Sequence, residues 1–290
     1  MTDAIRDDLG QEASAAIRAL MARHARPGLA ATLGSRPPAT ARASALGGPA
    51  WRQAPDTPWP VDHRGVAMMH LARIDVSAVP ALEGFPARGI VQIFISTEDF
   101  VFGADQPQGE GYVVEWWPDP AEGVAVAQPP FDDDDLEEGT PLVGSVAGGT
   151  VHALGQALAF ERADIPAGAD HPEVESALCE ALGAGANSRA MHRAREALAE
   201  GRPAVAIGGW PHGVQRGVQR GVQRGVQRGV QRGVQQGVAM DDHTVLLQIG
   251  DGHCDDVMWG GDIGTATFLI PAADLAAQRF DRVRYSASGY

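Results

Sequence analysis

Two stretches of this chain repeat the same order of short patterns, and this doubling is the strongest constraint on its fold. Each stretch opens with a Gly-Gly turn and continues through two apolar runs. The equivalent segments are 45–49, 71–75 and 89–95 in the first stretch, and 206–211, 246–251 and 264–270 in the second. Ile74 and Phe94 are 20 positions apart, and Ile249 and Phe268 are 19 apart. We therefore expect two related β-rich halves, an internal pseudo-duplication, packed together.

Runs of β-branched and aromatic residues that end at Pro, Gly or Asp predict the strands. These runs cover 66–74, 89–95, 112–117, 205–207, 244–249, 265–270 and 282–286. Apolar residues at helical spacing predict helices over 3–25, 172–182 and 188–200. The segment 33–60 is rich in Pro, Gly and Ala, so it is expected to be irregular. Strands in two blocks, with helices before and between them, indicate an α+β fold with N-terminal and inserted helices.

These elements predict one main domain preceded by a short lead-in. The lead-in, residues 1–42, contains the N-terminal helix and the start of the irregular segment. The domain then covers 43–290, with a first half at 43–150, a helical insert at 151–203 and a second half at 204–290. A chain of 290 residues is long enough for a full core shared by both halves.

Composition places the chain among water-soluble globular proteins. Hydrophobic residues make up 44% and charged residues 21%. No apolar run is long enough to cross a bilayer, and the acidic start of the chain has no apolar signal region. The two cysteines, Cys179 and Cys254, are far apart and form no disulfide framework. A cytoplasmic location is therefore expected.

The charge is strongly acidic, with a net value of −14 and no lysine among the 23 basic residues. Such a surface repels nucleic-acid phosphates and anionic lipids, so neither nucleic acid nor membrane is expected as a partner. A basic protein partner fits this charge. The alternative is that the acidity simply keeps the protein soluble.

A four-residue repeat interrupts the second half. Gly213-Val214-Gln215-Arg216 occurs five times through Arg232, and the near-copy 233–236 follows. The period is far shorter than the roughly 20 residues of a solenoid unit. A helix would carry a Gly in every turn, and a strand would put Val and Arg on one face. We expect a flexible excursion at 213–236, produced by duplication of a short coding unit; a basic ligand-binding arm is the alternative.

Five residues are the candidates for binding a ligand. Gln92 and Gln248 interrupt apolar strand runs, so each buried amide needs either backbone partners or a ligand. Trp59 and Trp259 could line a groove, together with Trp116, Trp117 and Trp210. Asp262 follows Trp259 closely and completes an exposed corner.

Other motifs favour structural roles. The Gly-Gly turns lack the spacing of a phosphate-binding loop. Neighbouring residues in 253–256, His-Cys-Asp-Asp, would point to opposite faces of a strand, so no metal site is expected, and no cofactor. His63, His70 and Asp75 suggest a general base, but His70 and Asp75 would face opposite sides of one strand. The acidic run 132–135 lacks the spacing of a calcium loop.

The order of motifs resembles the YwqG-like family over about 43–286. The resemblance rests on Leu-Gly-Gly-Pro at 46–49, on 69–75 and 85–95, on Ile-Gly-Gly-Trp-Pro at 207–211, and on 258–264. Two features depart from the family pattern: Arg73 stands where Gln is usual, and Trp259-Gly260-Gly261-Asp262 carries an additional Gly. The resemblance implies a bacterial α+β domain of unknown biochemical function, with relatives that neutralise toxins by binding them. It supplies no catalytic residues.

The sequence therefore predicts a cytoplasmic, non-enzymatic binding protein whose partner is a basic protein such as a toxin. The alternative is a hydrolase-like enzyme with a His/Asp cleft between the two halves. A small-molecule ligand and the oligomeric state stay open.

Overall fold

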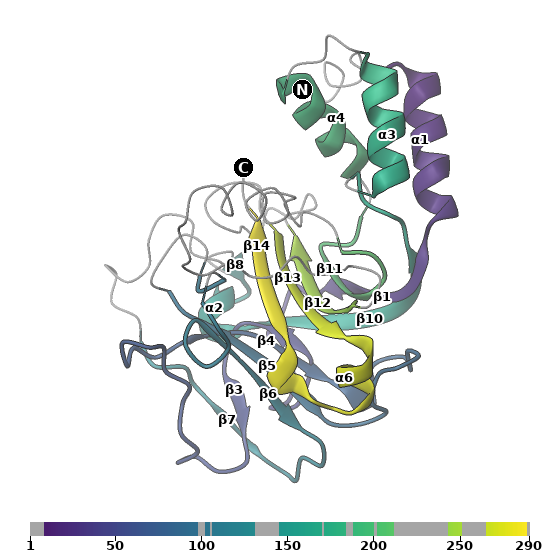
Figure 1. Ribbon diagram of the computed structural model, residues 1–290. Helices are drawn as coiled ribbons and strands as arrows, with labels where there is room; N and C mark the ends of the chain where they lie inside the picture. The colour runs from purple at the N-terminus through teal and green to yellow at the C-terminus, as the bar shows by residue number, and fades with distance from the viewer. Residues whose placement is uncertain are drawn as a thin grey trace, which may run out of the picture.

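A computed structural model describes the protein over residues 9–97, 102–104, 106–130, 145–169, 171–183, 188–199, 202–211, 243–250 and 265–288. Among these residues, ten strands form one sheet that curves into a nearly closed barrel (Figure 1). Three helices stand at one end of the barrel. The predicted mixture of helices and strands is confirmed, and strands predominate.

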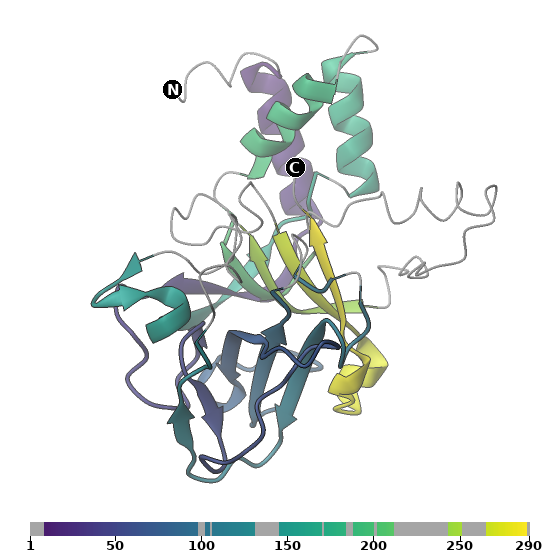
Figure 2. The same cartoon turned by 90° about the vertical axis from the view of Figure 1, so that its left-hand side faces the viewer.

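The strand order of the sheet is β14-β13-β12-β11-β1-β10-β2-β4-β5-β6. One side consists of β2 (Ala45–Leu46), β4 (Met69–Asp75), β5 (Ile90–Ile95) and β6 (Tyr112–Trp117). The other side consists of β11 (Val205–Gly208), β12 (His243–Gly250), β13 (Thr265–Pro271) and β14 (Arg284–Ser288). Read outward from the centre, the two sides have the same sequential order. Figure 2 shows them curving around a shared interior.

The centre of the sheet is the antiparallel pair of β1 (Arg26–Leu33) and β10 (Gln156–Ile165). Both strands were missed in the sequence. The predicted helical insert at 151–203 is wrong for 156–165, and the lead-in contains a central strand. Charged residues on β10 and small residues on β1 hide the apolar pattern, because only three of the ten residues of β10 are buried.

Smaller elements complete the fold. The predicted irregular segment 33–60 contains the short strand β2 and also β3 (Ala50–Arg52), which pairs with β7 (Val124–Val126) outside the main sheet. The remaining elements of the described residues are η1 (Val76–Ala78), β8 (Ser145–Val146), β9 (Gly149–Thr150), α2 (Val151–Leu154), α6 (Ala272–Ala276) and η4 (Phe280–Arg282). The first residue of the predicted strand 282–286, Arg282, therefore belongs to η4.

A β-bulge interrupts each side at the same place. It lies between His70 and Ala72 in the β4–β5 pair, and between Val245 and Leu247 in the β12–β13 pair. An extra residue reverses the alternation of side chains beyond the bulge. His70 and Asp75, which pair with Phe94 and Ile90, consequently share one face. The sequence-based expectation of opposite faces is wrong for this reason.

The barrel is closed by side chains between its edge strands. The Tyr112 hydroxyl on β6 donates a hydrogen bond of 2.9 Å to the carbonyl of Val283, just before β14. The Tyr112 ring contacts Tyr285 edge-on, with ring centroids 5.5 Å apart, and Phe268 stacks on Tyr285 at 4.5 Å. These three aromatic side chains are almost fully buried. They seal the interior, where both sides contribute to one apolar core.

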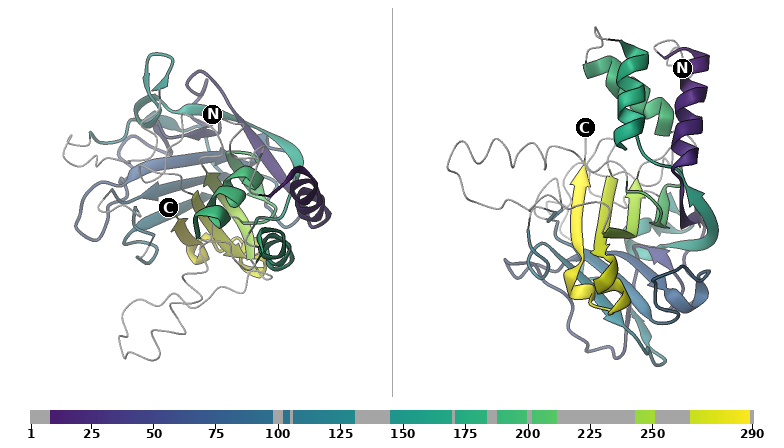
Figure 3. Two further views of the ribbon diagram at one scale, coloured as in Figure 1. Left: turned by 90° about the horizontal axis from the view of Figure 1, so that it is seen from above. Right: turned by 45° about the vertical axis from the view of Figure 1, so that its right-hand side comes forward.

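The helical unit consists of α1 (Gln11–Arg23), α3 (Pro172–Leu182) and α4 (Ser188–Ala199). It stands above the barrel (Figure 3) because α1 precedes β1, α3 follows β10 and α4 precedes β11, three neighbouring strands. Ile17, Met21, Val174, Leu178 and Leu198 form its own small core. In the described part of the chain, no helix is long and apolar enough to cross a membrane.

A tight crossing at Gly48 gives a test of this packing. Gly48 has a φ of +70°, and a Cβ there would lie 2.5 Å from the backbone nitrogen of Gly155. Gly65 has a φ of +82°, but a Cβ there would meet no atom within 4 Å. Gly48→Ala should lower the free energy of unfolding by about 3 kcal/mol or more, because backbone strain adds to overpacking. Gly65→Ala, the matched control, should lose about 1–2 kcal/mol from strain alone. Equal losses in urea denaturation would contradict the close crossing.

Candidate functional site

Two places in the described structure gather residues of interest: a buried polar cluster against β3, and an apolar pocket at one mouth of the barrel. The polar cluster begins with a row across three strands. Arg73 pairs with Gln92, and Gln92 pairs with Glu115. The corresponding row on the other side is Gln248, Thr267 and Ser286. Both faces of β5 are buried, so its one polar residue must find partners inside the protein.

The side-chain amide of Gln92 bonds to the main chain of Trp51 as the backbone of a neighbouring strand would. Its Oε1 accepts a hydrogen bond of 2.8 Å from the Trp51 amide, and its Nε2 donates one of 3.0 Å to the Trp51 carbonyl. Nε2 also donates to Glu115 Oε2 at 3.1 Å. Gln92 is fully buried. Its amide therefore fixes β3 to the sheet, which is the backbone-partner alternative of the two roles considered from the sequence.

Arg52 and Glu115 form a buried ion pair beside Gln92. Arg52 Nη1 donates to Glu115 Oε2 at 2.6 Å, and the side chain of Arg52 is 0% exposed against 19% for Glu115. The guanidinium also lies 4.9 Å from the ring centroid of Trp59 and 4.8 Å from that of Phe94. Aromatic faces attract cations, so these rings complete the surroundings of a charge held out of water.

His70 lies against the same aromatic group. It is fully buried, its ring centroid is 5.1 Å from that of Phe94, and its Nδ1–H donates to the Gly48 carbonyl at 2.9 Å. Burial, together with the nearby positive charges of Arg73 and Arg52, lowers the pKa of His70 to about 3. A neutral, solvent-free imidazole in this position stabilises the turn at Gly48.

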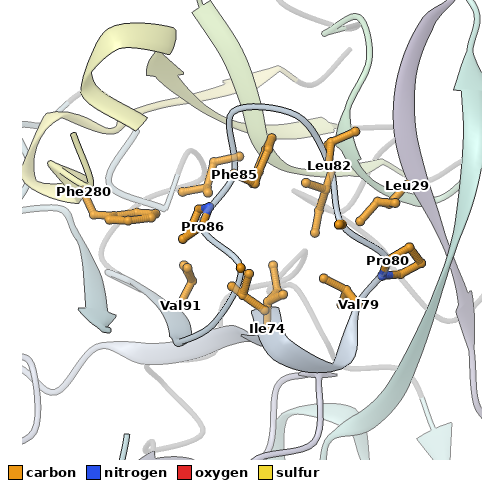
Figure 4. A pocket seen from close by; sticks show the side chains of 14 residues that line it. Leu29, Ile74, Val79, Pro80, Leu82, Phe85, Pro86, Val91 and Phe280 are labelled. Carbon is orange, nitrogen blue, oxygen red and sulfur yellow. The ribbon is translucent and has the colours of Figure 1, made fainter. Parts of the chain in front are cut away.

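The barrel-mouth pocket lies between the two sides of the sheet. The fourteen described residues that line it all have apolar side chains: Leu29, Ile74, Val76, Val79, Pro80, Ala81, Leu82, Phe85, Pro86, Ala87, Val91, Ile207, Leu246 and Phe280. Half of them belong to residues 79–87, which we call the strap. Figure 4 shows the strap arching over the pocket, with side chains from the barrel on the other side. The cavity volume is about 70 Å³.

The strap is attached mainly through side chains. Val79, Leu82 and Phe85 pack on the barrel core. Its one main-chain hydrogen bond among the described residues runs from the Phe85 amide to the Leu82 carbonyl, at 3.1 Å. This bond closes a turn at Gly84, whose φ of +80° suits glycine. Such a segment depends on apolar contacts for its position.

The structure separates the residues that the sequence nominated. Trp59 and Gln92 belong to the polar cluster, where the Trp59 indole donates to the Met68 carbonyl at 2.8 Å. Gln248 is buried on β12, in the other side of the sheet. Trp259 and Asp262 lie outside the described residues, as do the segments 132–135, 213–236 and 253–256.

The remaining tryptophans also lie apart. Trp117 contacts Trp51 beside the polar cluster, and Trp116 stacks on Phe280 near the pocket. Trp210 lies under the Arg26 guanidinium and donates to the His24 carbonyl, at the base of the helical unit. The described tryptophans therefore line no common groove.

Sequence reasoning missed both Glu115 and the pocket. The signal for Glu115 was the single charge within the aromatic and β-branched run of β6. The pocket residues had no polar signal, because a lining of Leu, Val, Pro and Ala looks like an ordinary core and loop.

The buried ion pair gives one testable prediction. Glu115→Gln removes the charge that compensates Arg52, so it should lower the free energy of unfolding by about 3 kcal/mol. The matched control is Asp119→Asn, whose partner Arg88 lies 3.8 Å away in a pair that is 73% and 84% exposed. That control should leave stability almost unchanged. Similar small losses for both variants in urea denaturation would show that the buried pair is not needed.

His70 predicts a pH dependence. In the unfolded chain a histidine has a pKa of about 6.5, whereas in the folded protein the pKa is about 3. Between these values the unfolded state binds the extra proton, so stability falls as the pH falls. Wild type should lose about 2 kcal/mol from this group between pH 7 and pH 5. His70→Asn keeps a donor for Gly48 and should lack this loss. Parallel stability curves for the two proteins would contradict a neutral buried His70.

Comparison with known proteins places the chain in a family without assigning it an activity. The model of the family described as Domain of unknown function (DUF1963) matches residues 44–288. This match includes every strand of the sheet except β1, which precedes it. No curated protein matches the chain. The match covers most of the chain, and the protein therefore belongs to the DUF1963 family.

Proposed function

We propose that this protein is a non-enzymatic binding protein and that the barrel-mouth pocket receives an apolar group of its partner. The observation that carries the proposal is the lining: fourteen described side chains without a polar atom surround the cavity. Such a surface can desolvate an apolar group, and it offers no acid, base or nucleophile. Binding an apolar group needs only desolvation, whereas catalysis needs an acid, a base or a nucleophile.

The proposed partner is a basic protein, such as a toxin, encountered in the cytoplasm. The net charge of −14 supports this part, because an acidic surface attracts a basic partner over a distance of about 10 Å or less at cellular salt. The finer resemblance to YwqG-like proteins, with their toxin-neutralising members, points the same way. An apolar anchor within a polar surround is the usual arrangement of energetic contacts in protein interfaces.

The alternative is a hydrolase-like enzyme with a His/Asp cleft between the halves. The described geometry supports it less well. His70 is buried on β4 with its Nδ1–H committed to Gly48. Asp75 accepts from the Arg42 side chain at 3.1 Å and from the Ser77 amide at 3.1 Å. Neither residue lines the pocket between the two sides.

We also propose that an internal duplication produced the two sides of the sheet. The mirrored strand order, the paired bulges and the Gly-Gly turns support it: Gly47 and Gly48 have φ values of +59° and +70°, and Gly208 and Gly209 have +69° and +70°. By strand register, Arg73 corresponds to Gln248 and Gln92 to Thr267. The pocket would then lie at the interface of two ancestral copies, where a binding site can form without a dedicated insertion.

Filling the pocket tests the proposed function. Ala81 lines the pocket at an exposed strap position, whereas Ala78 is exposed on η1 outside it. Affinity capture with wild-type protein should recover a basic protein partner whose binding weakens with salt. Ala81→Trp should weaken that binding at least tenfold, because the indole occupies the space for the anchor, and Ala78→Trp should not. Equal binding by both variants, or salt-independent turnover of a hydrolase substrate without any protein partner, would overturn the proposal.

A further inference from the structure

The size of the barrel-mouth pocket restricts what can enter it. The cavity measures about 70 Å³. An engineered cavity that holds benzene in a protein core has about 150 Å³. The present cavity has about half that volume, which is enough for a short aliphatic group and too small for an aromatic ring.

The polarity of the pocket excludes a charged or strongly polar group. All fourteen described side chains of the lining are apolar, so an ion that entered would lose water and meet no charged side chain there. Two pairs of opposite charges lie close in sequence to the lining, and Glu83 is an exposed carboxylate on the strap itself. Arg88 faces Asp119 at 3.8 Å, and Arg282 faces Asp281 at 3.7 Å. This balance gives no preference for a charged head group of either sign at these two places.

The strap adds a wall that can adjust. Leu82 packs directly over Gly208, the last residue of β11. A Cβ on Gly208 would lie 2.8 Å from Leu82 Cδ2. The Leu82 side chain therefore fills the end of the pocket next to β11. In the part of the chain that the structure describes, no main-chain hydrogen bond joins the strap to the barrel. Since Leu82 lies at this end of the pocket, it sets how deep a ligand can reach.

We infer that the pocket holds one aliphatic side chain of the protein partner, of the size of Val, Leu, Ile or Met, with Leu82 as the residue that limits its length. The inference rests on the proposed function and specifies its anchor. An aliphatic side chain matches both the volume and the absence of polar side chains in the described lining. It would also be surrounded, outside the pocket, by whatever polar and basic residues the partner presents to this acidic protein.

Short alcohols are suitable probes, because they present an alkyl chain with a hydroxyl that can stay in water. We would titrate the full-length protein with 1-propanol to 1-hexanol and follow the methyl NMR signals of Ile74, Leu82 and Leu246. Affinity should rise about fourfold per added methylene and level off once the cavity is full, at about four or five carbons. Benzene, butylammonium and butyrate should bind at least tenfold more weakly than 1-butanol. Absence of binding, or equal binding of benzene or of either ion, would overturn the inference.

Leu82→Ala tests the depth limit, with Glu83→Ala on the same strap as the control. Without the Leu82 side chain, affinity should keep rising for alcohols about two carbons longer than in wild type before it levels off. The variant should also bind benzene. Glu83 is exposed and does not line the pocket, so its variant should keep the wild-type profile. An unchanged profile in Leu82→Ala, in a variant whose thermal unfolding is still cooperative, would overturn the role of Leu82.

A further experiment distinguishes two natural occupants of the pocket, a side chain of a partner protein and a small alkyl compound. Mass spectrometry of solvent extracts should find no alkyl compound in wild-type protein that is missing from Ala81→Trp. Finding such a compound would overturn the inference that the occupant is a side chain of a protein partner. If Ala81→Trp abolishes partner binding while no alcohol binds to wild type, the proposed function stands and the aliphatic anchor fails. If alcohols bind as expected but the partner ignores Ala81→Trp, both the anchor and the proposed function fail.

Discussion

The antiparallel pairing of β1 with β10 determines how the rest of the protein is arranged. Their register is continuous over eight residue pairs, from Arg26 opposite Ile165 to Leu33 opposite Leu158. Each of the two strands also pairs with the first strand of one side, β1 with β11 and β10 with β2. The pair therefore joins two four-stranded sides into one curved sheet. No other strand pairing in the described sheet connects the two sides.

From this arrangement follow the places of the helices and of the pocket. The helices α1, α3 and α4 connect to β1, β10 and β11, so they gather at one end of the barrel. The pocket forms where the strap crosses the mouth of the barrel between the two sides. Leu29 of β1 and Ile207 of β11 also line it. A site of this kind depends on residues from five separate stretches of chain. It exists only when the sheet has closed.

The buried polar cluster has a different role from the pocket. It attaches the outlying pair β3–β7 to the main sheet through the Gln92 amide and the Arg52–Glu115 ion pair. Buried polar groups of this kind favour one arrangement over alternatives, because any other packing leaves them without partners. The cluster therefore selects the position of β3, whereas the apolar pocket is the proposed binding site.

Periodicity and turn residues were sufficient to locate most of the regular elements. The predicted runs at 89–95 and 112–117 match β5 and β6 to within one residue, and 172–182 matches α3. These segments have strong local patterns and clear ends. β1 and β10 lacked such patterns, because their partners, not their own composition, make them strands. The faces of His70 and Asp75 were also mispredicted, since a bulge is a property of the pairing and not of one strand.

The amino-acid sequence alone therefore determined the class of the fold, the approximate position of most strands and the acidic character of the molecule, because local periodicity and composition govern these properties. It also nominated Gln92 as a buried amide that needed partners. The choice among those partners, the central strand pair and the apolar pocket arose only in the folded molecule. Each of them depends on contacts between segments far apart in the chain, and no local pattern contains that information.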